Sequence, residues 1–399
     1  MNNLVNNLSS TFQGLTNIQK LLTLIIIAVL AYGVSTSLSY SLFSKMVTGS
    51  SGSSEKELTT SLPGPAGAFD EDPNEPKTEN CPLDGDLHTK KAKEFWDKRR
   101  PLAVMIENHS EARPQSGLTS ADIIYEAVAE GGITRFMAIY LCNLSDAQVG
   151  PVRSARTYYL DWLGEYDALY AHVGGANTPG PADALSQIIR FDVKDLNQFS
   201  IGFPVFWRDY QRLGHSVATE HTMYSTTQKL WEVGAKRGWV ATDSANIRWD
   251  KNFTPWKFKD DKGGGSTTKI TVNFWESQPG YQVEWNYDAT CNCYRRKHSG
   301  ENHVDLNNNK QLEARNVVVQ FQKESNANDG YPGNVHLLYK TTGTGNALIF
   351  MDGNVIEGKW TKNSRVARTK FADKNGKEIE FNRGQIWIQT VPEGSKVNY

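Results

Sequence analysis

The sequence predicts a mixed α/β or α+β protein with an N-terminal membrane anchor, a mixed α/β domain and then a smaller β-rich domain. Three observations support this prediction. An apolar stretch lies near the N-terminus, strand-like and helix-like runs are mixed over residues 95–240, and short β-rich runs replace them after about residue 265. The chain of 399 residues is long enough for about two folded domains at roughly 150 residues each.

The first element is the apolar segment 21–43, which carries no charge between Lys20 and Lys45. About 23 residues at 1.5 Å each suffice to cross a hydrocarbon core of about 30 Å. We therefore expect a transmembrane signal anchor that crosses the plasma membrane once, with residues 1–20 as a cytoplasmic tail. A cleaved signal peptide is the alternative. The Ser-, Gly-, Pro- and acid-rich segment 44–94 is expected to be a disordered tether outside the cytoplasm.

The expected α/β domain covers residues 95–262. The apolar run 102–106 is typical of a buried strand. The runs 121–129 and 133–141 flank a Gly-Gly turn and favour a β-hairpin, although the first run also fits a helical period. Ser154 is expected to cap the helix that follows.

The expected β-rich domain covers residues 263–399, and a glycine run at 263–265 offers a hinge before it. Helical patterning is weak in this part, and turn residues separate short runs that favour strands. These runs lie at 269–275, 281–288, 316–322, 335–340, 347–353 and 385–391.

Charge and cysteine content narrow the possible functions. The 43 basic and 44 acidic residues give a formal net charge of −1, so the chain lacks the basic field that holds nucleic acid. The four cysteines, Cys81, Cys142, Cys291 and Cys293, do not have the spacing of a zinc site. We interpret them as scattered thiols. A disulfide between Cys81 and Cys142 in an oxidising compartment is the alternative.

Long motifs in both expected domains resemble the YerB-like envelope family, which carries the N- and C-terminal domains of unknown function 3048. They are RPLAVMIENHSEARPQSGLTSADIIYEAVAEGGITRFMAIY at 100–140, VGPVRSART at 149–157, YDALYAHVGG at 166–175 and GKEIEFNRGQIWIQTVP at 376–392. The resemblance covers about residues 95–395. It implies an envelope location and no agreed catalytic activity. Members are commonly lipoproteins, whereas this chain has no cysteine before Cys81, so a transmembrane anchor is expected to replace the lipid.

The segment 150–156, GPVRSAR, predicts an anion pocket. If a helix begins at Ser154, its free backbone N–H groups and the guanidinium groups of Arg153 and Arg156 suit a phosphate, pyrophosphate or carboxylate. Arg135 on the neighbouring strand is expected to join them. The alternative is a structural ion-pair network with carboxylates such as Glu107, Glu126 and Asp161.

The remaining candidate ligand-binding residues lie near the ends of expected strands, where open α/β sheets place ligands. They are Glu107, His109, Asp122, His172, Gly174 and Gly175. Glu107 or Asp122 is a candidate to hold Mg²⁺ beside a bound phosphate, and no other cofactor is expected. The alternatives are hydrogen-bonded carboxylates and a core histidine. His215 and His221 flank a polar loop near the expected pocket.

A more distant similarity is to the LytR-CpsA-Psr envelope phosphotransferases, in which arginines bind a lipid-linked pyrophosphate and carboxylates hold magnesium. Arg153 matches one of these arginines, but the Ser-Ala before Arg156 departs from that family's Arg-Asp. Two functions therefore remain. The first is an envelope protein that binds an anionic glycan, a lipid head group or a protein partner. The second is a phosphotransferase or hydrolase of lipid-linked pyrophosphate glycans. The expected partners are the membrane, through the N-terminal helix, and cell-wall glycan or envelope proteins.

Overall fold

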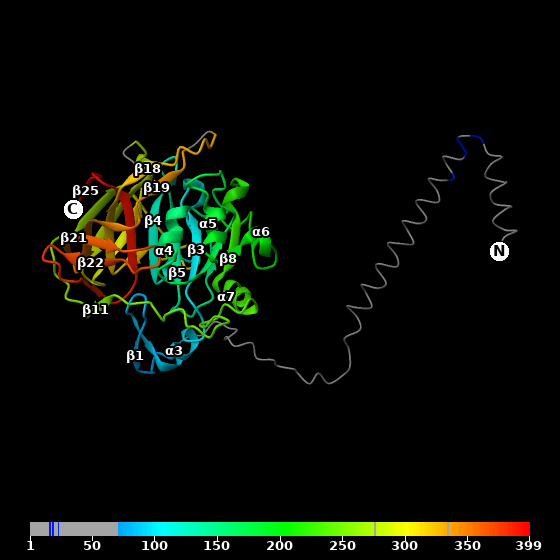
Figure 1. Cartoon of the computed structure of the whole chain (residues 1–399). Coiled ribbons are helices and arrows are strands. Elements are labelled where there is room, and N and C mark those ends of the chain that lie inside the picture. Colours follow the sequence, from blue (N-terminus) through cyan, green and yellow to red (C-terminus); the bar gives the residue numbers. More distant parts are fainter. Residues whose placement is uncertain (1–15, 17, 20–22, 24–70, 275–276, 333–334) are drawn as a thin grey trace, which may run out of the picture. The chain divides into compact units, whose positions relative to one another are not determined.

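A ten-stranded sheet forms the centre of the part of the chain that the computed structural model describes, namely residues 16, 18–19, 23, 71–274, 277–332 and 335–399. Figure 1 shows its late strands on one side and its early strands on the other. In spatial order the strands are β22 (Lys370–Asp373), β21 (Asn354–Lys362), β20 (Gly343–Met351), β17 (Asn316–Gln322), β24 (Ile386–Pro392), β4 (Ile123–Glu130), β5 (Ile133–Tyr140), β3 (Leu102–Glu107), β7 (Leu169–His172) and β8 (Lys194–Asn197).

The two halves of the chain join inside this sheet, where β24 pairs with β4. The two strands are parallel, with Ile386 opposite Ile123 and Gln389 opposite Glu126. One hydrogen-bonded sheet therefore takes strands from both expected domains. The fold is mixed and strand-rich, as the sequence predicts, while the division into domains at 262–263 stays a prediction.

Helices and a second sheet lie around the central sheet. The helices are α3 (Lys90–Trp96), α4 (Thr157–Leu163), α5 (Ala184–Arg190), α6 (Gln198–Ile201) and α7 (Thr227–Lys236), with 3-10 turns η1 (Ser110–Ala112), η2 (Leu118–Ser120), η3 (Thr219–His221) and η4 (Pro279–Tyr281). The second sheet contains β15 (Glu301–Asn302), β14 (Cys293–His298), β13 (Gln282–Asp288), β12 (Lys269–Asn273) and β25 (Val397–Asn398), with β16 (Glu313–Ala314) beside β14. Shorter strands are β6 (Gln148–Val149), β9 (Trp207–Arg208), β10 (Met223–Thr226), β11 (Lys257–Lys259), β18 (Glu324–Asn326), β19 (Leu337–Tyr339) and β23 (Glu380–Asn382).

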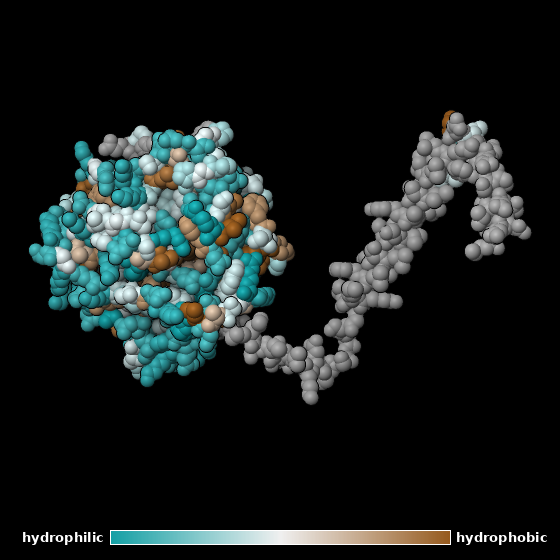
Figure 2. Space-filling view, viewed as in Figure 1, coloured by the Kyte–Doolittle hydropathy of each residue, from teal (hydrophilic) through white to brown (hydrophobic). Residues whose placement is uncertain are grey.

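The two faces of the central sheet are covered differently because side chains alternate along a strand. On one face Tyr125 of β4 stacks on Trp162 of α4, with ring centroids 5.3 Å apart. On the other face Trp387 of β24 meets Trp285 of β13 edge-on at 5.1 Å. The core is thus layered, with α4 on one side and the second sheet on the other. On the face seen in Figure 2 the surface is largely hydrophilic, with small and separate hydrophobic patches.

A buried polar network ties the second sheet to the central one. Glu126 and Arg296 are both fully buried, and Arg296 Nη2 lies 2.9 Å from Glu126 Oε1. Glu126 Oε2 accepts hydrogen bonds from the indole of Trp387 at 3.1 Å and from the amide of Gln389 at 3.0 Å. The carboxylate of this β4 residue therefore contacts residues of two other strands, β14 and β24.

A second buried network centres on Glu165, which follows α4. Lys362 Nζ lies 2.8 Å and Arg368 Nη1 3.0 Å from its carboxylate oxygens. Burial raises the pKa of Glu165, but these two cations outweigh burial and the pKa is lowered. Both networks thus join early residues to late ones through buried charge.

The strands expected from apolar runs are confirmed. The hairpin of β4 and β5 turns at Gly131 and Gly132, whose φ angles of +55° and +80° suit a tight turn that requires two left-handed residues. The six late β-rich runs correspond to strands β12, β13, β17, β19, β20 and β24.

The prediction that a helix begins at Ser154 is wrong. The helix α4 begins at Thr157, and its N-cap residue Arg156 makes no side-chain hydrogen bond to the first turn of the helix. The preceding residues are extended because they bond to neighbouring segments: Arg153 N donates to Met105 O and Ala155 N to Gly174 O, both at 2.9 Å. Tertiary pairing thus overrides the local capping signal.

Folded structure begins before the expected end of the tether at residue 94. Strands β1 (Lys77–Asn80) and β2 (Leu87–Thr89) pair, and Thr89 caps α3. These strands are short and polar, so no apolar period marks them in the sequence. The tail expected at 1–20, the segment 21–43 and the tether up to residue 70 lie, apart from residues 16, 18–19 and 23, outside the described residues.

Candidate functional site

The carboxylate of Glu107, at the end of β3, is the centre of a cluster of charged side chains. It is almost fully buried, and its two oxygens contact different partners. Arg153 Nε lies 3.1 Å from Oε1, and His221 Nδ1 lies 2.8 Å from Oε2. The hydrogen bond to Glu107 raises the pKa of His221, whereas burial lowers the pKa of Arg153.

Two more polar side chains complete this cluster. The ring of His109 stacks on that of His221, with centroids 4.8 Å apart and an interplanar angle of 13°. Glu111 Oε2 lies 3.7 Å from His221 Nε2. The sequence identified Glu107, His109 and Arg153 but not Glu111, and it left His221 in a polar loop. No local pattern in the sequence could place His221 in this cluster, because it contacts Glu107 from a position 114 residues further along the chain.

The other two predicted arginines share one carboxylate, that of Glu130. Arg135 Nη2 lies 2.9 Å from Glu130 Oε2, and Arg156 forms an ion pair with Oε1. The Arg156 side chain is also bonded to the Ala155 carbonyl at 2.6 Å, and burial lowers its pKa. The structure therefore brings Arg135 and Arg156 together at Glu130, within internal ion pairs. An anion pocket at these residues stays a prediction.

His172, Gly174 and Gly175 lie beside this arginine segment and support its backbone. His172 is buried, with Nδ1 2.7 Å from the Gly174 carbonyl and Nε2 2.6 Å from Asp195. Gly174 has a φ of +57°, which favours glycine. A Cβ on Gly175 would lie 2.9 Å from Leu185. Backbone geometry and packing therefore account for both glycines.

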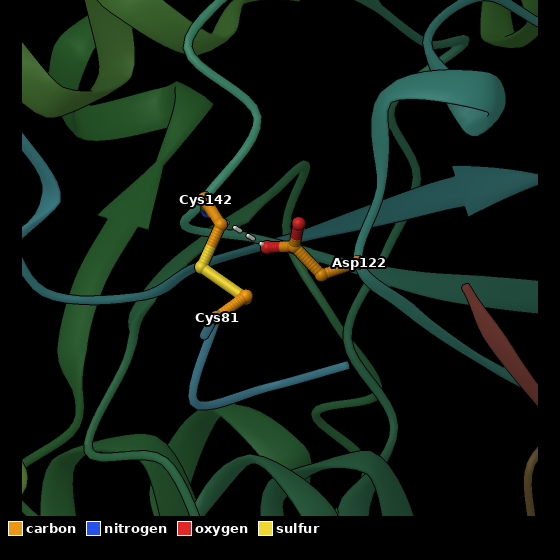
Figure 3. A group of neighbouring side chains, drawn as sticks. All are labelled: Cys81, Asp122 and Cys142. Atoms are coloured by element: carbon orange, nitrogen blue, oxygen red, sulfur yellow. Dashed lines mark hydrogen bonds between the residues drawn. A yellow bond between two sulfur atoms is a disulfide. The ribbon is translucent and has the colours of Figure 1, made fainter. Parts of the chain in front are cut away.

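Asp122 lies apart from the other candidates. In the ladder of β5, Arg135 lies opposite Glu107 and Ile139 opposite Ile123, so Asp122 and Glu107 are at opposite ends of that strand. Figure 3 shows Asp122 beside the Cys81–Cys142 disulfide, where it accepts the Cys142 amide hydrogen at 3.1 Å. Burial raises the pKa of Asp122 to about 6. Its oxygens serve backbone donors rather than the Glu107 cluster.

All four cysteines of the sequence form disulfides, which corrects the interpretation as scattered thiols. Cys81 pairs with Cys142, 61 residues away, and both are buried. Cys291 pairs with Cys293, two residues away. The sequence left the first pair as an alternative because only the fold shows that β1 and the end of β5 meet.

A polar cavity of about 700 Å³ opens beside β14, β16 and the turn before β24. Its charged lining residues are the cations Arg295, Lys310, Arg315 and Arg383 and the acids Asp86 and Glu313. Each arginine pairs with a carboxylate: Asp288, Asp261 and Asp260 respectively. The ammonium group of Lys310 has no ion-pair or hydrogen-bond partner within the described part of the chain.

Comparisons with known proteins match almost the whole described region. The model of the DUF3048 N-terminal domain matches residues 88–240 and that of the DUF3048 C-terminal domain matches residues 270–388, both described as protein of unknown function. The chain is 30% identical over 323 residues to "Putative lipoprotein YerB" of Bacillus subtilis (strain 168), covering 80% of this chain and 88% of that protein. The crystal structure of the YerB protein from Bacillus subtilis superposes with a TM-score of 0.67 at 28% identity, covering 81% of this chain and all of that one.

These findings correct the expectation of a transmembrane signal anchor. The relative is described as a lipoprotein. Among the residues that the structure describes, no helix has both the length and the apolar character to cross a bilayer.

Proposed function

This chain belongs to the DUF3048 family, and from that membership we propose that it is a membrane-associated cell-envelope protein that works outside the cytoplasm. The pairing of all four cysteines supports this location. Disulfides form and persist in oxidising compartments and are rare in the cytosol. The description of the relative as a lipoprotein supports the association with a membrane.

We further propose that the protein binds an anionic ligand in the cavity beside β14 and β16. The unpaired ammonium group of Lys310 carries this proposal, since a cation without an internal partner is available to a phosphate or carboxylate. The cavity has the volume of a small-molecule site. Within the described residues Lys310 is the one cation of the lining that no carboxylate neutralises, because the three arginines of the lining each pair with an aspartate. A phosphate- or carboxylate-bearing glycan or lipid head group has the matching chemistry.

The contacts of the predicted arginines favour binding over phosphotransfer. A transferase of lipid-linked pyrophosphate needs arginines that are free to contact the substrate. In this structure Arg153 pairs with Glu107, and Arg135 and Arg156 pair with Glu130. We therefore propose a binding role for the protein and no phosphotransferase activity at these arginines.

The proposed location predicts the state of the cysteines in cells. When native membranes are denatured in acid and treated with a maleimide reagent, the full chain is expected to gain no label until it is reduced, and four labels afterwards. The variant Cys291→Ser is the matched control, because it frees Cys293 and must be labelled without reduction. Labelling of the unreduced wild type at several cysteines would place the chain in a reducing compartment.

The proposed cavity predicts a specific loss of anion binding. Replacing Lys310 by glutamate is expected to weaken the binding of inorganic pyrophosphate more than tenfold, because a charge-assisted hydrogen bond contributes about 1.5–3 kcal/mol. Isothermal titration calorimetry at fixed ionic strength measures the change. Lys340→Glu has the same net charge at an exposed site outside the cavity lining and is expected to bind as the wild type does. Equal losses in both variants would mean non-specific attraction and would contradict the proposed site.

A further inference from the structure

We propose that His109, Glu111 and His221 form a binding site for a divalent transition metal ion, with Zn²⁺ as the ion of best fit. One ligand atom from each of these residues lies within 4.8 Å of the others. This site lies at the end of β3 and is separate from the cavity that contains Lys310. It therefore extends the function beyond the proposed binding of an anion.

The donor set selects the class of metal. Two imidazole rings and one carboxylate are ligands that zinc accepts in proteins, whereas Mg²⁺ and Ca²⁺ prefer oxygen ligands alone. Two ligands on one tetrahedral zinc ion lie about 3.3 Å apart, given bonds of 2.0–2.1 Å. Glu111 Oε2 and His221 Nε2 are already 3.7 Å apart. Closing the site requires two movements: the exposed Glu111 side chain moves slightly toward His221, and the His109 ring turns out of its stack on His221, because the lone pairs of two parallel rings lie in separate planes.

Glu107 prepares His221 for this role. Its buried carboxylate is an acceptor, so His221 Nδ1 donates the hydrogen bond of 2.8 Å. In the neutral ring the lone pair is then on Nε2, the nitrogen nearest Glu111. A carboxylate behind a histidine ligand fixes the ring and strengthens the nitrogen as a donor. Arg153 contacts the other oxygen of Glu107 and so holds the carboxylate in place. Glu107 is therefore a residue that positions the His221 ring and does not itself bind the metal.

The local chain keeps His109 and Glu111 together. His109 caps the 3-10 turn η1 by accepting the Glu111 amide hydrogen on Nδ1 at 3.2 Å, a hydrogen bond that a metal ion bound at this lone pair replaces. Its ring also stacks on that of His221. Because Glu111 is 56% exposed, the open side of the site faces solvent. Three protein ligands leave a fourth position for water or an anionic oxygen, the arrangement of an accessible zinc site.

Metal uptake by the oxidised full chain tests the site. After treatment with EDTA and dialysis, the wild type is expected to bind one equivalent of zinc, measured by elemental analysis and by titration calorimetry. His109→Gln, Glu111→Gln and His221→Gln are each expected to weaken zinc binding at least tenfold, with unchanged circular dichroism. His215→Gln is the control, because His215 is exposed and its ring contacts only the Leu213 carbonyl in the described structure; it is expected to bind zinc as the wild type does.

The positioning role of Glu107 has its own readout. Glu107→Ala is expected to weaken zinc binding by about 10–100-fold, the usual effect of losing such a partner. Glu107→Gln retains an acceptor for His221 Nδ1 and is expected to restore much of the affinity. The visible spectrum of bound Co²⁺ should shift in Glu107→Ala and not in His215→Gln. A wild type that takes up no zinc, or zinc binding that survives all three ligand substitutions, would overturn the proposal.

Discussion

Replacing Arg296 by methionine is expected to lower the free energy of unfolding by about 3–5 kcal/mol, because it leaves the buried Glu126 without a counter-charge. The guanidinium group also lies over the ring of Trp387, 4.6 Å from its centroid. Denaturant titration measures the loss. Tryptophan fluorescence is a direct probe, since Trp285 and Trp387 lie next to the network.

Two variants test whether the loss comes from the unpaired charge. Arg295→Met changes the adjacent residue of the same strand, whose side chain is 40% exposed and pairs with Asp288. Because exposed ion pairs contribute little, this variant is expected to lose less than about 1 kcal/mol of unfolding free energy. The double variant Glu126→Gln/Arg296→Met removes both charges and is expected to be more stable than Arg296→Met alone. If the double variant is the less stable of the two, uncompensated charge is not the cause.

Removing the Cys81–Cys142 disulfide is expected to cost about 4 kcal/mol of unfolding free energy. The chain-entropy relation gives this value for a loop of the observed length, with a sequence separation of 61. The double variant Cys81→Ala/Cys142→Ala tests it by denaturant titration without reductant. The loss of stability is expected because, without the disulfide, this loop gains conformational freedom in the unfolded chain.

The second disulfide is the matched control. Cys291→Ala/Cys293→Ala opens a loop with a sequence separation of 2, for which the same relation gives only about 1–2 kcal/mol. The short-range pair is therefore expected to cost less than half as much as the long-range one. Equal losses would show that loop length does not determine the effect here.

Local patterns in the sequence account for most of the strands but not for their arrangement. Apolar runs predict β3, β4, β5 and β17 because burial on both faces leaves a continuous hydrophobic signal. The pairing of β24 with β4 joins residues near 386 and 123. No local period records such a distant contact. The same limit explains why Ser154 was interpreted as a cap, since the bonds that extend its segment come from Met105 and Gly174.

In the candidate site, too, the sequence predicts which residues of one segment lie together but not which distant residues they contact. Residues on one stretch of chain, such as Glu107 and His109, were grouped correctly from the end of one strand. Glu130, which neutralises two arginines, lies next to the Gly-Gly turn and carries no local signal of this role, and His221 comes from a loop far along the chain. Ion pairing depends on which side chains meet in space, so the sequence left the arginines with two interpretations.

The position of β24 has a consequence for the time at which this protein can finish folding. The strand ends at Pro392 of 399 residues, yet it lies inside the central sheet between β17 and β4. Because the chain is synthesised from its N-terminus, β4 is available for pairing long before this neighbour. Until then one edge of β4 has unpaired backbone groups, which are a template for pairing with other chains. Chaperones that shield nascent chains therefore have the most to protect in the interval between the synthesis of β4 and that of β24.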